Sequence, residues 1–513
     1  MSDERASQVR GDAHPVTRDI VLSPRHRWRA YWIAVSVAAI TILDLSKVNV
    51  ALPSIETALN AGSTELQLIV SGYVLTFGLT LVPAGRLGDL RSRRLLFVIG
   101  LSLFLLTSLA CALAPNGTLL LLFRLLQGVA AGIQMPQVLG LVQQLFTGKE
   151  RGRAFGLFGA TIGVATALGP TLGGLLIALG GETDGWRLIF WINIPLALIV
   201  LVLAAFFLPD TRTKSRRKLD LDPVGIVLFG GAIIALLWPF LFTTGSPDDD
   251  PRRWWTLVAC VVLVALFVFW ERRYAARGRM PLIPFAVFRH ASFRNGILVS
   301  ASYFAATPAI FLLGTLYLQS GLGLAPLFAG MVTIGFAAVS AGSAWVGGTL
   351  VNRIGRPLVV WGLVGMLATV AALVAVVVLT PAAWTPWAMA GVLALGGLAG
   401  GLVVSPNQTL TLAEIPVRQG GVAGSIGQLG QRIGTAVGTA VALALFYATV
   451  YREQDGRPDL AVYHDAYGFG MVSVGIFLGL ALIAGVVDLA VRRRHGDPMT
   501  PLAPEQPAAD QTP

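Results

Sequence analysis

The stretch Gly85-Arg-Leu-Gly-Asp89-Leu-Arg-Ser-Arg93 occurs a second time, 263 residues later, as Gly348-Thr-Leu-Val-Asn352-Arg-Ile-Gly-Arg356. Glycine, leucine, a short carboxylate or amide, and arginine keep their spacing in both copies. Each copy stands at the end of a long apolar run. A repeat of this kind predicts a chain that is built from two homologous halves.

Long apolar runs fill most of the remaining chain. Hydrophobic residues make up 55% of the sequence and charged residues only 13%, whereas about 25% of residues are charged in an ordinary soluble domain. A run of roughly 20 apolar residues is long enough to cross a bilayer as a helix. We predict fourteen membrane-spanning helices, at residues 31–52, 66–87, 95–113, 119–141, 155–179, 188–208, 224–242, 254–270, 297–318, 327–350, 358–379, 387–410, 422–447 and 469–491.

The fourteen spans divide into six, two and six. Gly169 and Gly173 of the fifth span recur as Gly434 and Gly438 of the thirteenth. We therefore predict an all-α membrane protein with two six-helix halves and a two-helix insert, a plan in which the halves can rock about a central cavity. The predicted segments are an N-terminal tail (1–29), the N-terminal half (30–210), a linker with the insert and an interfacial segment (211–295), the C-terminal half (296–491) and a disordered tail (492–513).

Basic residues concentrate in alternate loops, for example at residues 91–94, 212–218 and 272–294. Because loops on the cytoplasmic side carry the excess of Lys and Arg, both termini are predicted to be cytoplasmic. The net charge of +11 then indicates contact with anionic lipid headgroups rather than with nucleic acid. The amphipathic segment at residues 281–293 is expected to lie along the inner headgroup layer.

Motifs for catalysis and for cofactor binding are missing from the sequence. It contains no GxxxxGK[ST] phosphate loop and no HExxH zinc motif. All five histidines lie in predicted tails or loops, and the two cysteines, Cys111 and Cys260, lie inside apolar runs. We therefore expect neither an enzyme nor a metal site nor a cofactor, and the energy for any transport must come from a gradient or from the substrate itself.

Five motifs resemble signatures of one known family. The loop at residues 85–94 is similar to the GxLaDrxGrk signature of the major facilitator superfamily. Its RxxQG signature is similar to Arg124-Leu-Leu-Gln127-Gly128, and its GPxxGG signature is similar to Gly169-Pro170-Thr-Leu-Gly173-Gly174. Two more stretches resemble signatures of its fourteen-span drug:proton antiporters: the first-span stretch from Leu43 to Pro53 and the sixth-span stretch from Trp186 to Pro195. The resemblance extends over almost the whole chain.

The resemblance implies roles for two groups of residues. The first group is expected to latch a cytoplasmic gate, whereas the simpler alternative is a solvated, positively charged turn. It comprises Gly85, Gly88, Asp89, Arg93, Asn352 and Arg356. The second group is expected to mark an exporter rather than an importer, and the alternative is close packing of two helices through small residues. It comprises Gly169, Pro170, Gly173 and Gly174.

Three charged residues lie inside predicted spans one and four, where each costs about 2.5 to 3.5 kcal/mol unless it is paired or reaches water. Helix geometry places Asp44 about 12 Å and Arg124 about 8 Å from the outer surface. Lys47 lies one turn from Asp44 on the same face. Asp44 can therefore meet either Lys47 or Arg124, and a proton arriving at Asp44 would break that pairing; the alternative is a static salt bridge. Lys47 departs from the family pattern, which is uncharged there, and this departure indicates either a permanent pair or a site that tolerates an anionic group.

Polar residues on three spans are candidates to line a substrate cavity. Span four carries a polar stripe at helical spacing, and span thirteen carries a second one. The alternative is that these side chains only hold helices together. The candidates are Asn49, Gln127, Gln134, Gln428, Gln431 and Arg432.

These features predict a secondary transporter that exports amphipathic small molecules, such as drugs or antibiotics, in exchange for protons. Other possibilities are an exporter of a lipid or an endogenous metabolite, an uptake symporter or, outside this class, a channel or receptor. The expected partners are a small-molecule substrate, protons and the lipid bilayer, and the chain is expected to be a monomer. Arginine greatly outnumbers lysine, which is typical of a GC-rich bacterium and predicts the bacterial cytoplasmic membrane.

Overall fold

The computed structural model describes residues 23–61, 63–209, 222–242, 250–452 and 460–494. Within these ranges the chain is helical and contains no strand, and fourteen helices are long and apolar enough to cross a membrane, which confirms the predicted number. The N-terminal half contains α1 (Pro24–Leu59), α2 (Ser63–Leu90), α3 (Arg93–Ala112), α4 (Gly117–Leu145), α5 (Gly148–Trp191) and α6 (Asn193–Phe207). The insert contains α7 (Pro223–Phe242) and α8 (Thr256–Ala276). The C-terminal half contains α9 (Ala291–Leu316), the short α10 (Pro326–Met331), α11 (Ile334–Ile354), α12 (Arg356–Leu379), α13 (Thr385–Thr411), α14 (Gly420–Arg452) and α15 (Leu460–Arg494).

Several helices extend beyond the apolar runs that predicted them. Helix α1 already begins at Pro24, inside the segment expected to be a tail, because proline is favourable in the first turn and the Ser23 side chain caps the helix. Helix α9 begins at Ala291 rather than at residue 296, and α15 continues to Arg494. Polar end turns carry no hydropathy signal, so the sequence pattern placed these ends too far inside.

Helix α5 contains the fifth span and the start of the sixth, which fold back against each other, and the helical backbone is interrupted at two positions. The first break is at Gly181, whose φ of 81° is a left-handed conformation that favours glycine. The second is at Ile192, directly before α6. Pro195 has no backbone N–H to continue the hydrogen-bond ladder, which explains the interruption there. The second break places Asn193 at the start of a helix in the middle of the bundle.

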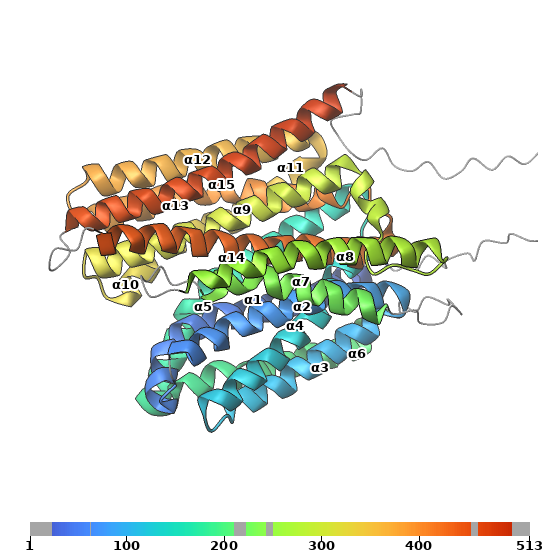
Figure 1. The fold of residues 1–513 in the computed structure, drawn as a ribbon, viewed down its shortest axis with the longest axis horizontal. Coiled ribbons are helices and arrows are strands. Elements are labelled where there is room, and N and C mark those ends of the chain that lie inside the picture. The colour runs from blue at the N-terminus through green and yellow to red at the C-terminus, as the bar shows by residue number, and fades with distance from the viewer. Residues whose placement is uncertain (1–22, 62, 210–221, 243–249, 453–459, 495–513) are drawn as a thin grey trace, which may run out of the picture.

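The two halves form separate bundles that lie side by side along their length (Figure 1). Each half has its own apolar core, and the insert helices α7 and α8 lie at the junction, where α7 contacts both α2 and α14. The start of α1 and the end of α15 lie at the same end of the molecule, which we call the terminus end; the opposite end is the far end. This arrangement matches the predicted plan of two six-helix halves and an insert.

Glycines bring the two halves into close contact at the terminus end. A β-carbon built on Gly85 of α2 would lie 2.8 Å from the carbonyl oxygen of Gly421 on α14. On the other side of the junction, a β-carbon on Gly152 of α5 would lie 2.6 Å from the carbonyl oxygen of Gly348 on α11. Side chains do not fit at these distances, so both crossings require glycine.

The contact between α5 and α11 loosens toward the far end. The nearest α11 atom lies 2.6 Å from a β-carbon built on Gly152, 3.1 Å from one on Gly156 and 3.9 Å from one on Gly163. The two helices therefore diverge with distance from the terminus end. The structure represents a conformation in which the two halves are closed against each other at the terminus end.

Asp89 binds the first copy of the repeat to the opposite half. Its carboxylate accepts hydrogen bonds from the backbone N–H groups of Gly421 (3.1 Å) and Val422 (3.0 Å), at the start of α14. The positive end of a helix dipole favours a carboxylate at this position. Arg93 completes the contact, because it pairs with Asp89 at 2.8 Å and donates to the carbonyl oxygen of Val417 at 2.7 Å.

The second copy of the repeat has different partners. Arg356 forms an ion pair of 2.5 Å with Asp488 of α15 and donates to Asn407 of α13 at 2.6 Å, so its bonds remain inside the C-terminal half. Asn352 lies against the first turns of α5, where a β-carbon on Gly152 would come within 2.8 Å of its Nδ2 atom. The sequence repeat is therefore reflected in the helix crossings but not in the ion pairs.

The segment that follows α8 is packed into the protein. Leu282, Ile283 and Val287 are buried and belong to the apolar core of the N-terminal half. The backbone N–H groups of Leu282 and Ile283 also donate to the buried carboxylate of Glu271. The segment was predicted to lie along the headgroup layer, but its apolar side chains pack against other parts of the protein.

The orientation predicted from the loop charges can be measured in cells. In a background with both native cysteines replaced by serine, Ala382→Cys lies in the exposed far-end loop before α13, and Arg277→Cys lies exposed after α8. We expect a membrane-impermeant maleimide to label the first variant in intact cells and the second only after permeabilisation. The reverse pattern would show that the termini are outside.

The contact between Asp89 and α14 can be tested through the accessibility of Ser425, which is buried where α2 crosses α14. Asp89→Ala removes the acceptor of two backbone N–H groups and the partner of Arg93, and charge-assisted bonds contribute about 1.5 to 3 kcal/mol each. We expect a Ser425→Cys probe in the same cysteine-free background to react about tenfold faster or more with a thiol reagent when Asp89 is replaced.

The matched control is Asp184→Ala, because Asp184 forms an exposed ion pair with Arg187 in the short turn that joins the fifth and sixth spans. We expect no change in the labelling of Ser425→Cys in this variant. Equal labelling rates in the Asp89 variant and its parent would show that the Asp89 contact does not hold the halves closed.

Candidate transport site

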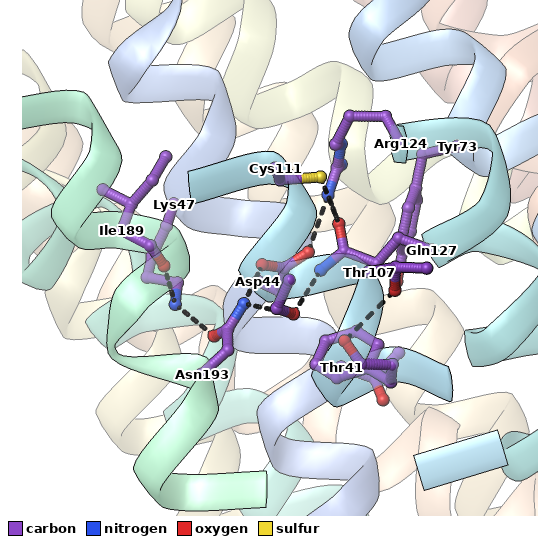
Figure 2. A network of polar contacts seen from close by, with 12 residues as sticks. Thr41, Asp44, Lys47, Tyr73, Thr107, Cys111, Arg124, Gln127, Ile189 and Asn193 are labelled. Atoms are coloured by element: carbon purple, nitrogen blue, oxygen red, sulfur yellow. Dashed lines mark hydrogen bonds and ion pairs between the residues drawn. The ribbon is translucent and has the colours of Figure 1, made fainter. Parts of the chain in front are cut away.

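Asp44 lies at the centre of a buried polar network in the N-terminal half (Figure 2). Its carboxylate accepts hydrogen bonds from Arg124 Nη1 of α4 at 2.8 Å and from Asn193 Nδ2 of α6 at 2.6 Å. The side chains of Asp44 and Arg124 are completely buried. The ion pair therefore joins α1, α4 and α6 in surroundings where neither charge reaches solvent.

Lys47 joins the network through Asn193 and does not contact Asp44 directly. Its ammonium group donates to Asn193 Oδ1 at 2.8 Å and to the backbone carbonyl oxygen of Ile189 at 2.9 Å. The Asn193 amide thus accepts from Lys47 and donates to Asp44 (Figure 2). Of the two partners predicted for Asp44, Arg124 pairs directly and Lys47 is connected through one amide.

Arg124 has more contacts than its carboxylate partner. It donates to Gln127 Oε1 at 2.7 Å and to the carbonyl oxygen of Ile69 at 3.3 Å. Its guanidinium carbon lies 4.2 Å from the centre of the Tyr73 ring, a distance typical of a cation–π contact. The Nη2 atom of Arg124 and the hydroxyl group of Tyr73 are buried and have no hydrogen-bond partner among the described residues.

Two predicted cavity residues instead hold helices together in this structure. Gln127 donates to Ser108 of α3 at 2.8 Å, and Gln134 donates to Thr41 of α1 at 2.8 Å. Both glutamine side chains are completely buried. In this conformation the polar side chains of α4 connect neighbouring helices, which is the alternative to lining a cavity.

Asn193 is a member of the site that sequence reasoning did not select. Asn193 lies within the stretch from Trp186 to Pro195 that resembles the sixth-span signature, two residues before Pro195. A polar side chain inside a strongly apolar helix next to a proline was a usable signal, because such a helix break frees backbone groups for other bonds. The carbonyl oxygen of Ile189, which accepts from Lys47, lies one turn before this break.

The GPxxGG motif lies against the segment of α1 that contains the charges. A β-carbon on Gly169 would clash with Ser46, and one on Gly173 would lie 3.2 Å from the carbonyl oxygen of Lys47. In the C-terminal half the equivalent glycines face α9, Gly434 at Ala301 and Gly438 at Ala305. All four of these glycines, Gly169, Gly173, Gly434 and Gly438, therefore allow close helix packing within their own half.

Three other predicted residues give less information. A β-carbon on Gly174 would meet no atom within 4 Å, so this position is not required for close packing. The side chains of Pro170 and Asn49 lie outside the described residues. Gly88 and Arg93, which were predicted to belong to a gate, lie toward the terminus end, where Gly88 faces Gln137 of α4.

The polar residues of α14 lie in the C-terminal half. Gln428 and Gln431 line a small, partly open pocket together with Ser300 of α9 and Gln408 of α13, and Gln431 donates to Ser300 at 3.1 Å. Arg432 points in another direction, because its guanidinium carbon lies 4.8 Å from the centre of the Phe77 ring on α2. The predicted cavity residues of α14 thus reach both a cavity and the junction between the halves.

The arrangement favours binding and charge movement over catalysis. In the part of the chain that the structure describes, no group of three or more His, Cys, Asp or Glu residues could hold a metal ion. The network combines one carboxylate, two cations and several amides on four helices. Such a site can change its net charge when a proton binds, and every member is tied to another helix.

The comparisons with known proteins agree with this architecture. The model of the Major Facilitator Superfamily matches residues 34–439. The chain is 31% identical over 430 residues to the "Probable actinorhodin transporter" of Streptomyces coelicolor, and the aligned region covers 83% of this chain and 73% of that protein. It is also 31% identical over 449 residues to the "Tetracenomycin C resistance and export protein" of Streptomyces glaucescens, covering 85% of this chain and 78% of that protein.

A solved structure with the same fold is that of the proton:xylose symporter XylE, with a TM-score of 0.61 and 15% identity over 92% of this chain and 96% of that chain. The family model and the two relatives cover most of the chain. They confirm the predicted family and show a transporter rather than an enzyme. This chain belongs to the major facilitator superfamily and is related to its antibiotic exporters and multidrug resistance proteins.

Proposed function

We propose that this protein exports amphipathic small molecules in exchange for protons, and that Asp44 carries the coupled proton. The observation that supports this most directly is the complete burial of Asp44 between Arg124 and Asn193, on three helices of one half. Proton binding to this carboxylate changes the charge of a dry, fully connected network. A charge change in such a place has structural consequences.

Protonation of Asp44 removes the direct counter-ion of Arg124. A buried charge that loses its partner costs about 3 to 5 kcal/mol, so the protonated network is expected to rearrange until Arg124 finds water or another acceptor. The Nη2 atom of Arg124 is already without a partner among the described residues. Proton binding therefore favours a different arrangement of α1, α4 and α6.

Helix α5 can carry this rearrangement to the contact between the halves. Gly173 of α5 packs on the backbone of Lys47, and Gly152 of the same helix crosses Gly348 of α11 at the terminus end. A shift of α1 therefore acts on a helix that also takes part in closure. Closure at the terminus end and the charge state of Asp44 are linked by continuous packing.

Export is favoured by the relatives rather than by the fold. The tetracenomycin C protein is named for resistance and export, and the actinorhodin protein is named as a transporter. The proton:xylose symporter shares the fold at 15% identity, so the fold alone does not decide the direction of transport. The uptake symporter and the lipid or metabolite exporter are the competing transporters, and a channel is the competitor from another class.

The cellular setting is part of the same proposal. The positive-inside pattern places both termini in the cytoplasm of a bacterial cell, with the terminus end facing inward. The protein then acts as a monomer whose energy comes from the proton gradient, without a bound cofactor. In this orientation the structure is closed toward the cytoplasm.

Asp44→Asn tests the coupling. In proteoliposomes we expect the natural protein to accumulate a xanthene dye, fluorescein or rhodamine 123, when a proton gradient is imposed. The variant should lose this accumulation by about tenfold or more, because the amide cannot release a proton. Exchange of labelled for unlabelled dye without a gradient should continue, because it needs substrate binding but no net proton movement.

The control is Asp184→Asn, which changes an exposed carboxylate outside the network and should behave like the natural protein. Gradient-driven accumulation at the normal rate in the Asp44 variant would remove the coupling role from this residue. Non-saturable dye movement without counterflow would instead indicate a channel.

A further inference from the structure

Arg432 of α14 lacks the carboxylate partner that three other arginines inside the bundle have. Arg93, Arg124 and Arg356 each pair with a carboxylate. Arg432 forms no hydrogen bond and no ion pair within the described residues, and its Nε atom is buried without a partner. It lies in α14, twelve residues after Gly420, or about 18 Å along the helix axis. An unpaired cation near the middle of a membrane helix is costly and marks a functional position.

Aromatic rings on α2 form the other side of this position. The Arg432 guanidinium lies over the Phe77 ring at 4.8 Å, one turn from Tyr73. Tyr73 lies close enough to Arg432 and Arg124 to interact electrostatically with both, and its hydroxyl group has no partner among the described residues. The contact joins α14 of one half to α2 of the other, at the junction where a transported molecule must pass.

The charge balance around this junction is positive. Asp44 is the carboxylate of the network, whereas Lys47, Arg124 and Arg432 are cations. Cation–π contact with Phe77 stabilises the Arg432 guanidinium only in part and leaves its N–H groups available. The missing element is an anion with acceptor oxygens, which a planar guanidinium binds in bidentate fashion.

Polar and apolar surfaces suited to a larger ligand adjoin Arg432. The preceding residue, Gln431, and Gln428 one turn earlier line a small pocket in the C-terminal half, on the side of α14 that faces α9 and α13. A ligand pocket typically combines apolar walls with a few polar groups that fix orientation. At the junction, Arg432 supplies the charge and Phe77 the aromatic wall.

We infer that Arg432 is an anion-recognition site and that the substrates are amphipathic molecules with an acidic group, such as an aromatic carboxylate or phenolate. This inference rests on the proposed export function and adds the substrate class to it. The acidic group binds Arg432 while the aromatic body lies along the junction between α2 and α14. Cationic amphiphiles of the same size are disfavoured by the three cations nearby.

Two dyes with the same ring skeleton and opposite charge test the inference. We expect the purified natural protein to bind fluorescein, an anion, about tenfold or more tightly than rhodamine 123, a cation, as measured by fluorescence anisotropy. Arg432→Gln should weaken fluorescein binding by about tenfold or more, whereas Arg432→Lys, which keeps the charge, should retain most of it. Rhodamine 123 binding should not weaken in either variant, which also shows that the variants are folded.

The matched control is Arg153→Gln, because Arg153 also lies over an aromatic ring, that of Trp28 at 5.4 Å, but is exposed near the terminus end. This variant should bind both dyes like the natural protein. Unchanged fluorescein binding by Arg432→Gln, or a preference of the natural protein for rhodamine 123, would overturn the inference. If fluorescein binds through Arg432 but is never moved against a gradient, the export proposal fails and the anion site remains.

Discussion

A charge inside an apolar helix bundle needs a partner, and this constraint organises the structure at three levels. In the N-terminal half, Asp44 and Arg124 neutralise each other where α1, α4 and α6 meet. In the C-terminal half, Arg356 and Asp488 do the same between α12 and α15. At the terminus end, Asp89 combines an ion pair with the positive end of α14 and so connects the halves. Each of these contacts compensates charge by joining helices that are distant in the sequence.

Close backbone packing makes these pairs possible. Gly85 and Gly152 allow the two halves to touch at the terminus end, and Gly173 allows α5 to lie directly on α1 beside Lys47. Small residues are the usual means of helix association in membranes, where lipid tails remove the hydrophobic driving force. Here the same glycines connect a titratable network to a contact between halves. The junction between the halves and the buried polar network are therefore parts of one packed unit.

Arg432 is a charge inside the bundle that lacks such a partner among the described residues. Its guanidinium faces Phe77 across the junction and has no carboxylate within the described residues. A transporter needs such an incomplete position, because a substrate binds best where the protein leaves a group unsatisfied. The pairs of Asp44 with Arg124 and of Arg356 with Asp488 each lie within one half, whereas Arg432 lies between the halves.

Sequence alone determined the number of spans, the plan of two halves with an insert and the family, because each depends on the order and spacing of residues along the chain. Only the tertiary structure decided which groups are partners: Asn193 between Asp44 and Lys47, and Asp488 for Arg356. It also decided that Gln127 and Gln134 face neighbouring helices. The physical reason is that a partner depends on which helices meet and how each is rotated, and hydropathy records depth but not rotation.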